Sequence, residues 1–159
     1  MAMMIEREEK FVVFEGVGGS GKTSQLPIAS GYLLEKTVPH IVTREPGGVE
    51  SAEHIRELIF KLKGKGVINA DHQMALFFAA RSLWVQNLVA PNLSDGKSVL
   101  SDRSYAATAA YQGYGEGGDP SVIEVIAREV MGEYMPNAII LLDISAETSH
   151  MRNANHKDG

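Results

Sequence analysis

The sequence predicts an α/β domain in which helices flank a central parallel sheet, and two observations indicate this fold class. Short apolar runs typical of buried strands alternate with longer stretches of helical periodicity. This alternation is characteristic of parallel sheets, whose connecting helices cover both faces. In addition, a glycine-rich segment joins the first apolar run to the first helical stretch.

Length and composition limit the possible functions. The 159 residues suit one domain, and the net charge of -5 argues against a protein that coats nucleic acid. The absence of cysteine excludes a disulfide scaffold, a zinc-thiolate site and a thiol nucleophile. No apolar run is long enough to span a bilayer, and the N-terminus lacks the features of a signal peptide. We therefore expect a cytoplasmic protein that binds neither nucleic acid nor a membrane.

The first part of the chain predicts two strands and two helices. Residues 11–14 form an apolar run between charged residues and glycines, which is typical of a buried strand. Residues 22–35 have helical periodicity, and residues 40–43 predict a second strand. Proline and paired glycines make residues 44–48 a loop, and the apolar stripe of residues 51–63 predicts an amphipathic helix.

The middle of the chain predicts a long helix, a strand and a shorter helix. Residues 71–88 are unusually apolar for a helix, and Asp71 is its expected N-cap. Residues 98–101 predict the third strand, and a helix is expected over residues 105–111. The glycines within residues 112–120 predict a loop.

The last part of the chain continues the alternation. Residues 121–131 predict a helix, and the apolar run 138–142 predicts the fourth strand. A further helix begins at Ala146.

The glycine-rich segment matches the phosphate-binding pattern G-x-x-x-x-G-K-[ST] and lies between a predicted strand and a helix. Glycines let successive backbone N–H groups point at phosphate oxygens, and the helix N-terminus adds to the attraction. Lys22 is expected to reach the β- and γ-phosphates of ATP, and Thr23 to ligate Mg²⁺. The motif predicts the three-layer P-loop NTPase fold, with these nucleotide-binding residues: Gly16, Val17, Gly18, Gly19, Ser20, Gly21, Lys22, Thr23 and Ser24.

The same segment also matches G-x-G-x-x-G, the fingerprint of dinucleotide-binding sites, through Gly16, Gly18 and Gly21. In that interpretation Glu45, just after the second strand, would bind a ribose. Only a phosphate loop requires Lys22 and Thr23, so the sequence favours a nucleoside triphosphate.

Two charged residues follow the third strand. Asp102 ends that strand at the edge where α/β sheets bind ligands, so we expect it at the metal, as a partner in the second coordination shell of Mg²⁺. Arg103 suits the phosphate of a second substrate. The alternative is an ordinary surface ion pair.

Phe77 and Arg81 lie four residues apart and therefore share a helix face. They could stack on a planar base and bond its edge carbonyl, or they could be a core phenylalanine and an arginine that snorkels to solvent. Arg44 and Arg56 flank the Pro-Gly-Gly loop, where they could clamp an acceptor phosphate or simply be exposed.

Taken together, these segments resemble the thymidylate kinase family, whose members phosphorylate dTMP with ATP. The order and approximate spacing follow the family from residue 11 to about residue 152. The matching segments are Phe14-Glu-Gly16 with the phosphate loop, Thr43-Arg-Glu-Pro-Gly-Gly48, Leu76-Phe-Phe-Ala-Ala-Arg81, Asp102-Arg103 with Ala110-Tyr-Gln-Gly113, and Leu141-Leu-Asp143.

The resemblance implies an ATP- and Mg²⁺-dependent kinase that converts dTMP to dTDP in dTTP synthesis. It also implies a homodimer that uses the helix containing Phe77. The implied catalytic residues are Lys22, Asp102, Arg103 and Arg152, with Thr23 and Asp102 at the metal.

The resemblance also implies how dTMP is bound. Phe77 would stack on thymine, Arg81 would bond its O4 and Thr108 its N3 edge. Pro46 would shape the pocket around the 5-methyl group, and Arg103, with Arg44 or Arg56, would hold the phosphate. Tyr111 would lie under the deoxyribose, and Gln112 would line the same pocket.

The chain departs from the family pattern in three places, one of which is Ser104-Tyr105 in place of a more usual pair after Asp102-Arg103. Gly18 stands where the family usually has an acidic residue in the phosphate loop, which keeps another nucleoside or nucleotide kinase as an alternative. The loop has no arginine, so Arg152 in the lid would supply positive charge to the transition state. We expect residues 1–159 to form one P-loop kinase domain without the rest of the lid, the last strand and the last helices. This short lid also leaves a catalytically weak nucleotide-binding module as an alternative.

Overall fold

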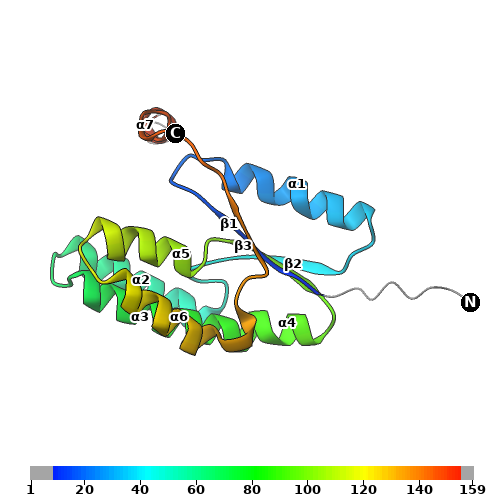
Figure 1. The fold of residues 1–159 in the computed structure, drawn as a ribbon, viewed down its shortest axis with the longest axis horizontal. Coiled ribbons are helices and arrows are strands. Elements are labelled where there is room, and N and C mark those ends of the chain that lie inside the picture. The colour runs from blue at the N-terminus through cyan, green and yellow to red at the C-terminus, as the bar shows by residue number, and fades with distance from the viewer. Residues whose placement is uncertain (1–8, 155–159) are drawn as a thin grey trace, which may run out of the picture.

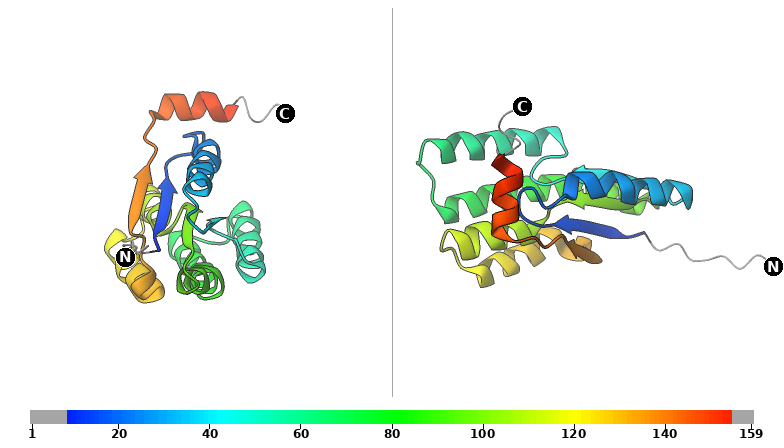
Figure 2. Two further views of the ribbon diagram at one scale, coloured as in Figure 1. Left: turned by 90° about the vertical axis from the view of Figure 1, so that its right-hand side faces the viewer. Right: turned by 90° about the horizontal axis from the view of Figure 1, so that it is seen from above.

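The computed structural model describes residues 9–154, which form three layers: a central parallel sheet with helices on both of its faces (Figures 1 and 2). The sheet has four strands in the order β2-β3-β1-β4. The strands are β1 (Phe11–Glu15), β2 (His40–Arg44), β3 (Ser98–Asp102) and β4 (Ala138–Leu141). All four predicted strands are confirmed, with ends that differ by one residue. The order places β1 beside β3, and Phe14 pairs with Asp102, so the phosphate loop and Asp102 lie at the same edge.

Helices lie on both sides of this sheet (Figure 1). One side carries α1 (Lys22–Glu35), which packs on β1, β2 and β3. The other side carries α2 (Glu50–Gly64), α3 (Ala70–Trp84), α4 (Ala90–Ser94), α5 (Tyr105–Thr108) and α6 (Pro120–Met131). The last described helix, α7 (Ala146–Ala154), lies at the carboxyl end of the sheet (Figure 2). No helix within residues 9–154 combines the length and hydropathy that crossing a membrane requires.

The alternation of side chains along β1 builds a core on each face of the sheet. Phe11 is buried against Trp84 of α3, with ring centroids 5.8 Å apart in an edge-to-face arrangement. The Trp84 indole N–H donates to Thr43 Oγ1 at 3.1 Å, which ties α3 to β2. On the other face, Phe14 packs with Leu26 of α1 and Leu100 of β3.

Helices were expected to cover both faces of the whole sheet, but they do not cover β4. All four residues of β4 are exposed, and Leu141 keeps 66% of its surface accessible. The helical layers of the described residues therefore protect mainly β1, β2 and β3.

The predicted N-cap of the long helix is wrong. The helix begins at Ala70, and Asn69 caps it by accepting a hydrogen bond from His72 N at 3.0 Å. His72 completes a capping box, since its Nδ1 accepts from Asn69 N at 3.4 Å. Asp71 lies in the first turn, two residues after the cap, where its charge faces the positive end of the helix dipole.

The predicted end of that helix at residue 88 is also wrong. The backbone remains helical beyond α3 through a π-helical segment, η1 (Val85–Val89), and then through α4. Pro91 lies just after this π-helical segment and does not stop the helix.

The predicted loop at residues 112–120 is helical in its first part. The chain continues from α5 into a second π-helical segment, η2 (Ala109–Gly115). Gly113 permits this because α6 lies close against it: a Cβ there would meet Ile123 Cδ1 at 3.2 Å. A short 3₁₀ helix, η3 (Gly132–Tyr134), follows α6.

We predict that Asn69→Ala lowers the free energy of unfolding by about 1 kcal/mol, because the Ala70 helix loses its side-chain cap. Asp71→Ala is the matched control and should have a smaller effect, since Asp71 acts only through the helix dipole. Urea unfolding of both variants tests this. A larger loss from Asp71→Ala would contradict the capping assignment.

Candidate functional site

The loop between β1 and α1 has a backbone that only glycine adopts without strain. Gly16, Gly19 and Gly21 have φ angles of 147°, 73° and 103°. At Gly16 a Cβ would also lie 2.6 Å from the carbonyl oxygen of Leu142, so this position has no room for a side chain. The loop leads into the N-terminus of α1, which favours an anion.

A cavity of about 650 Å³ opens in front of this loop. Its lining brings together residues from the phosphate loop, the end of β3 and the last helix: Gly18, Gly19, Gly21, Lys22, Thr23, Ser24, Asp102, Arg103 and Arg152. Three cations and the start of α1 therefore meet in one space, an arrangement that suits the negative charges of a triphosphate.

Lys22 is held inside the loop. Its ammonium donates to the carbonyl oxygens of Gly16 at 2.8 Å and Val17 at 3.1 Å. Burial lowers the pKa of Lys22, and Arg103 adds to this, whereas Asp102 acts in the opposite direction. The loop thus positions the ammonium next to the phosphate cavity.

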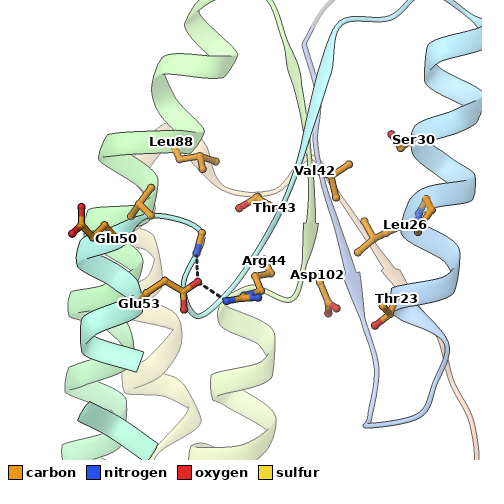
Figure 3. Close-up of a pocket in the computed structure, with 13 residues that line it drawn as sticks. Thr23, Leu26, Ser30, Val42, Thr43, Arg44, Glu50, Glu53, Leu88 and Asp102 are labelled. Atoms are coloured by element: carbon orange, nitrogen blue, oxygen red, sulfur yellow. Dashed lines mark hydrogen bonds and ion pairs between the residues drawn. The ribbon is translucent and has the colours of Figure 1, made fainter. Parts of the chain in front are cut away.

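The residues predicted at the metal have chemistry that fits Mg²⁺. Thr23 and Asp102 line the same cavity, and Figure 3 shows them with Arg44 at one end of a neighbouring space. Asp102 Oδ1 is buried and has no hydrogen-bond partner within residues 9–154. A hydroxyl and an unpaired carboxylate oxygen are ligands that Mg²⁺ prefers. The described residues contain no cluster of three or more metal-binding side chains, so nucleotide oxygens and water would complete the coordination.

Arg103 occupies a special backbone position that Glu15 braces. Its φ is 74°, in the left-handed region that a non-glycine residue rarely adopts. Glu15 Oε1 accepts from the next backbone N–H, that of Ser104, at 2.9 Å. Glu15 Oε2 lies 4.0 Å from Arg103 Nη1, and the Arg103 guanidinium lies 5.6 Å from the centroid of the Tyr111 ring. Glu15 was not among the predicted site residues, although a carboxylate between a buried strand and a phosphate loop is a usable signal.

A smaller, mostly apolar cavity of about 290 Å³ lies beside Arg103. It is lined by most of the residues that the resemblance assigns to dTMP: Pro46, Phe77, Arg81, Arg103, Thr108 and Tyr111, together with Glu45, Phe60, Lys63, Ser104 and Ala107. Phe77 contributes to this lining, as the ligand-binding interpretation requires.

Arg81 is buried, which excludes the interpretation in which it snorkels to solvent. Its side chain is 2% exposed, Nη2 donates to Thr108 Oγ1 at 3.0 Å, and Nε lies 2.6 Å from Glu45 Oε1. The guanidinium also lies 4.5 Å from the centroid of the Phe78 ring. Burial raises the pKa of Glu45, and the Arg81 charge counteracts that rise.

Three predicted substrate residues lie outside this cavity. Arg44 and Arg56 both pair with Glu53, at 2.5 Å and 3.7 Å. Arg44 lines a cavity of about 820 Å³ between α1 and α2, where Figure 3 shows its contact with Glu53. Gln112 is buried and donates to Gln73 Oε1 at 3.2 Å, so its side chain links η2 to α3.

Helix α7 rests against the phosphate loop. Arg152 Nη1 donates to the carbonyl oxygen of Gly19 at 2.9 Å, and Ser149 Oγ donates to that of Gly18 at 2.8 Å. A Cβ on Gly18 would lie 2.9 Å from Asn153 Nδ2. The side chain of Asn153 therefore lies where an acidic residue at position 18 would begin.

We predict that Glu15→Gln becomes more stable relative to the wild-type chain as pH rises. Burial raises the pKa of Glu15 above its ordinary 4.5, so the folded state holds that proton more tightly than the unfolded state. The wild type therefore loses stability as pH rises from 4.5 to the folded pKa, and the glutamine variant does not. Urea unfolding of both proteins across this range measures the difference. A stability difference that stays constant with pH, or that changes in favour of the wild type as pH rises, would contradict the raised pKa of Glu15.

Comparison with known proteins agrees with this geometry. The family model described as thymidylate kinase matches residues 14–158. The chain is 38% identical to the thymidylate kinase of Carboxydothermus hydrogenoformans over 90% of its own length and 70% of that protein. It is 40% identical to that of Pelotomaculum thermopropionicum and 36% identical to that of Prosthecochloris aestuarii, covering 67% and 65% of those proteins. The chain thus spans about two thirds of the length of these relatives.

A solved structure gives the same answer. The crystal structure of thymidylate kinase from Ehrlichia chaffeensis superposes with a TM-score of 0.77 at 33% identity, covering 94% of this chain and 85% of that one. Sequence and fold therefore agree over nearly all of the chain, and the chain belongs to the thymidylate kinase family.

Proposed function

We propose that the protein transfers the γ-phosphoryl group of ATP to the 5′-phosphate of dTMP, giving dTDP for dTTP synthesis. The observation that carries this proposal is the position of Arg103. Its side chain lines both the 650 Å³ cavity at the phosphate loop and the 290 Å³ cavity that holds Phe77 and Arg81. A donor phosphate in the first space and an acceptor phosphate next to the second would both meet this guanidinium.

The donor would bind along the phosphate loop, with its β- and γ-phosphates next to Lys22. Thr23 and Asp102 would hold Mg²⁺, which supplies positive charge to the phosphate oxygens. Ser20 Oγ is buried without a hydrogen-bond partner in the described part of the chain, which leaves a donor free at the loop.

The acceptor would place its base in the 290 Å³ cavity. Phe77 offers a ring for stacking, and Pro46, which also lines the cavity, would lie near the 5-methyl group. Arg81 and Thr108 supply polar groups for the base edge, and Tyr111 would lie beneath the deoxyribose. Arg44, Arg56 and Gln112 do not line this cavity, so we do not carry forward their direct contacts to the substrate.

The chemistry requires positioning and charge neutralisation rather than a covalent intermediate. The attacking oxygen of a monophosphate is already an anion, so no strong general base is needed. Lys22, Arg103 and Arg152 would stabilise the charge that spreads over the transferred group. Arg152 is suited to this because α7 already holds it against Gly19.

We also propose that the enzyme is a cytoplasmic homodimer that pairs through the α3 region. Leu76 and Leu83 of α3 are only partly buried in the single chain, and Leu58 of the adjacent α2 is 43% exposed. A second copy would cover these side chains. Light scattering of the purified protein tests the dimer, and a mass of one chain would contradict it.

A coupled assay with ATP, Mg²⁺ and separate monophosphates tests the substrate. We predict product from dTMP, because Arg81 and Thr108 in the cavity would bond a keto edge and Pro46 would border the 5-methyl group. Turnover of dCMP or UMP without turnover of dTMP would refute the substrate assignment. Binding of ATP and dTMP without product would indicate a nucleotide-binding module instead.

We predict that Lys22→Ala lowers kcat far more than it weakens dTMP binding. The ammonium serves the transferring phosphoryl group, whereas the thymine cavity does not include Lys22. Steady-state kinetics and direct dTMP titration separate the two effects. An equal loss in both quantities would contradict this role.

A further inference from the structure

We propose that Glu45 is a positioning residue: through its buried ion pair it fixes the guanidinium of Arg81 so that the pocket selects a base with a keto group at its edge. This inference rests on the proposed function, which assigns Arg81 to the base. The sequence had suggested Glu45 only as a ribose ligand of a dinucleotide site. The structure instead places its carboxylate against Arg81.

Arg81 is constrained on three sides, and Nη1 is its one nitrogen with neither an ion-pair nor a hydrogen-bond partner among residues 9–154. Glu45 Oε1 lies 2.6 Å from Nε, Thr108 Oγ1 accepts from Nη2 at 3.0 Å, and the ring of Phe78 lies against the guanidinium plane. The remaining nitrogen, Nη1, is buried and has no hydrogen-bond partner within the described residues. Arg81 lines the 290 Å³ cavity, so Nη1 is the group that a ligand there can satisfy.

The charge of Arg81 needs Glu45. Both side chains are 2% exposed, so water does not compensate either charge. Within residues 9–154, Glu45 is the acidic residue that forms an ion pair with Arg81. A buried guanidinium without a counter-charge would reorient toward other acceptors or toward solvent.

Glu45 is itself held by the sheet. Its backbone N–H donates to the carbonyl oxygen of Asp102 at 2.9 Å, directly after β2 pairs with β3. The next residue, Pro46, lines the same cavity as Arg81. The backbone of Glu45 is therefore fixed to the sheet, and its carboxylate in turn fixes the position of the Arg81 side chain on α3.

This arrangement has a consequence for base selection. A fixed, unpaired N–H donor is satisfied by the 4-keto group of thymine or uracil, whereas the 4-amino group of cytosine would leave two donors facing each other. A site built to bond one partner rejects an analogue that leaves its buried group unpaired. Without Glu45 the guanidinium is no longer fixed, and both affinity and discrimination should fall.

The test measures binding of dTMP, dUMP and dCMP to the wild type, to Glu45→Gln and to Glu45→Asp by calorimetric titration. Glu124→Gln is the matched control, because Glu124 forms an exposed ion pair with Arg128 at 2.7 Å. Glu45→Gln should weaken dTMP and dUMP binding by about tenfold or more while dCMP changes little, so the preference for keto bases falls. Glu45→Asp keeps the charge and should retain part of the preference. In kinetics the KM for dTMP should rise more than kcat falls.

A double-mutant cycle shows whether Glu45 acts through Arg81. In an Arg81→Met background, the further change Glu45→Gln should alter dTMP affinity by less than about twofold. If Glu45 contacted the base directly, its loss would still weaken binding in that background. That result would overturn the positioning role. The neutral double variant also avoids an unpaired buried charge, so it remains a usable protein if Glu45→Gln unfolds.

The outcomes separate this inference from the proposed function. If the wild type binds dTMP but the Glu45 variants keep the affinity and preference of Glu124→Gln, only the positioning role fails. If the wild type does not bind dTMP, the proposed function fails as well. Thermal unfolding of every variant distinguishes a loss of fold from a change in recognition.

Discussion

The parallel pairing of β1 with β3 is the constraint on which the site depends. It places Phe14 opposite Asp102, and Arg103 N donates to the carbonyl oxygen of Phe14 at 2.9 Å just beyond the last pair. The phosphate loop and the Asp102-Arg103 segment therefore leave the sheet side by side. Every cavity that bears on phosphates or base opens at this edge, at the carboxyl ends of the strands.

Buried charge organises the rest of the site. Glu15 braces the left-handed turn at Arg103, and Glu45 holds Arg81 at the base cavity. Both carboxylates follow or end a sheet strand, so rigid elements position the cations. The two pairs work at different ends of the substrate: one at the phosphates and one at the base.

The sequence predicted those features that local pattern determines. Strand positions follow from apolar runs, and the phosphate loop follows from glycines and Lys22 between a strand and a helix. It could not predict which of Asn69 and Asp71 caps α3, because both residue types suit that position and the extended backbone of Asn69 decides. Nor could it predict the burial of Arg81 or the link from Gln112 to Gln73, since each depends on a partner in a distant element. The glycines of residues 112–120 predicted a loop, but the first part of this segment is helical in η2, where α6 packs closely on Gly113.

The central claim is that a nucleoside triphosphate and dTMP bind on opposite sides of Arg103. A crystal structure with a non-hydrolysable ATP analogue, Mg²⁺ and dTMP tests it most directly. We expect the terminal phosphate at the loop of Gly16 to Lys22, the acceptor phosphate at Arg103, and thymine stacked on Phe77. A thymine ring far from Phe77, or an analogue that leaves the loop empty, would contradict the account.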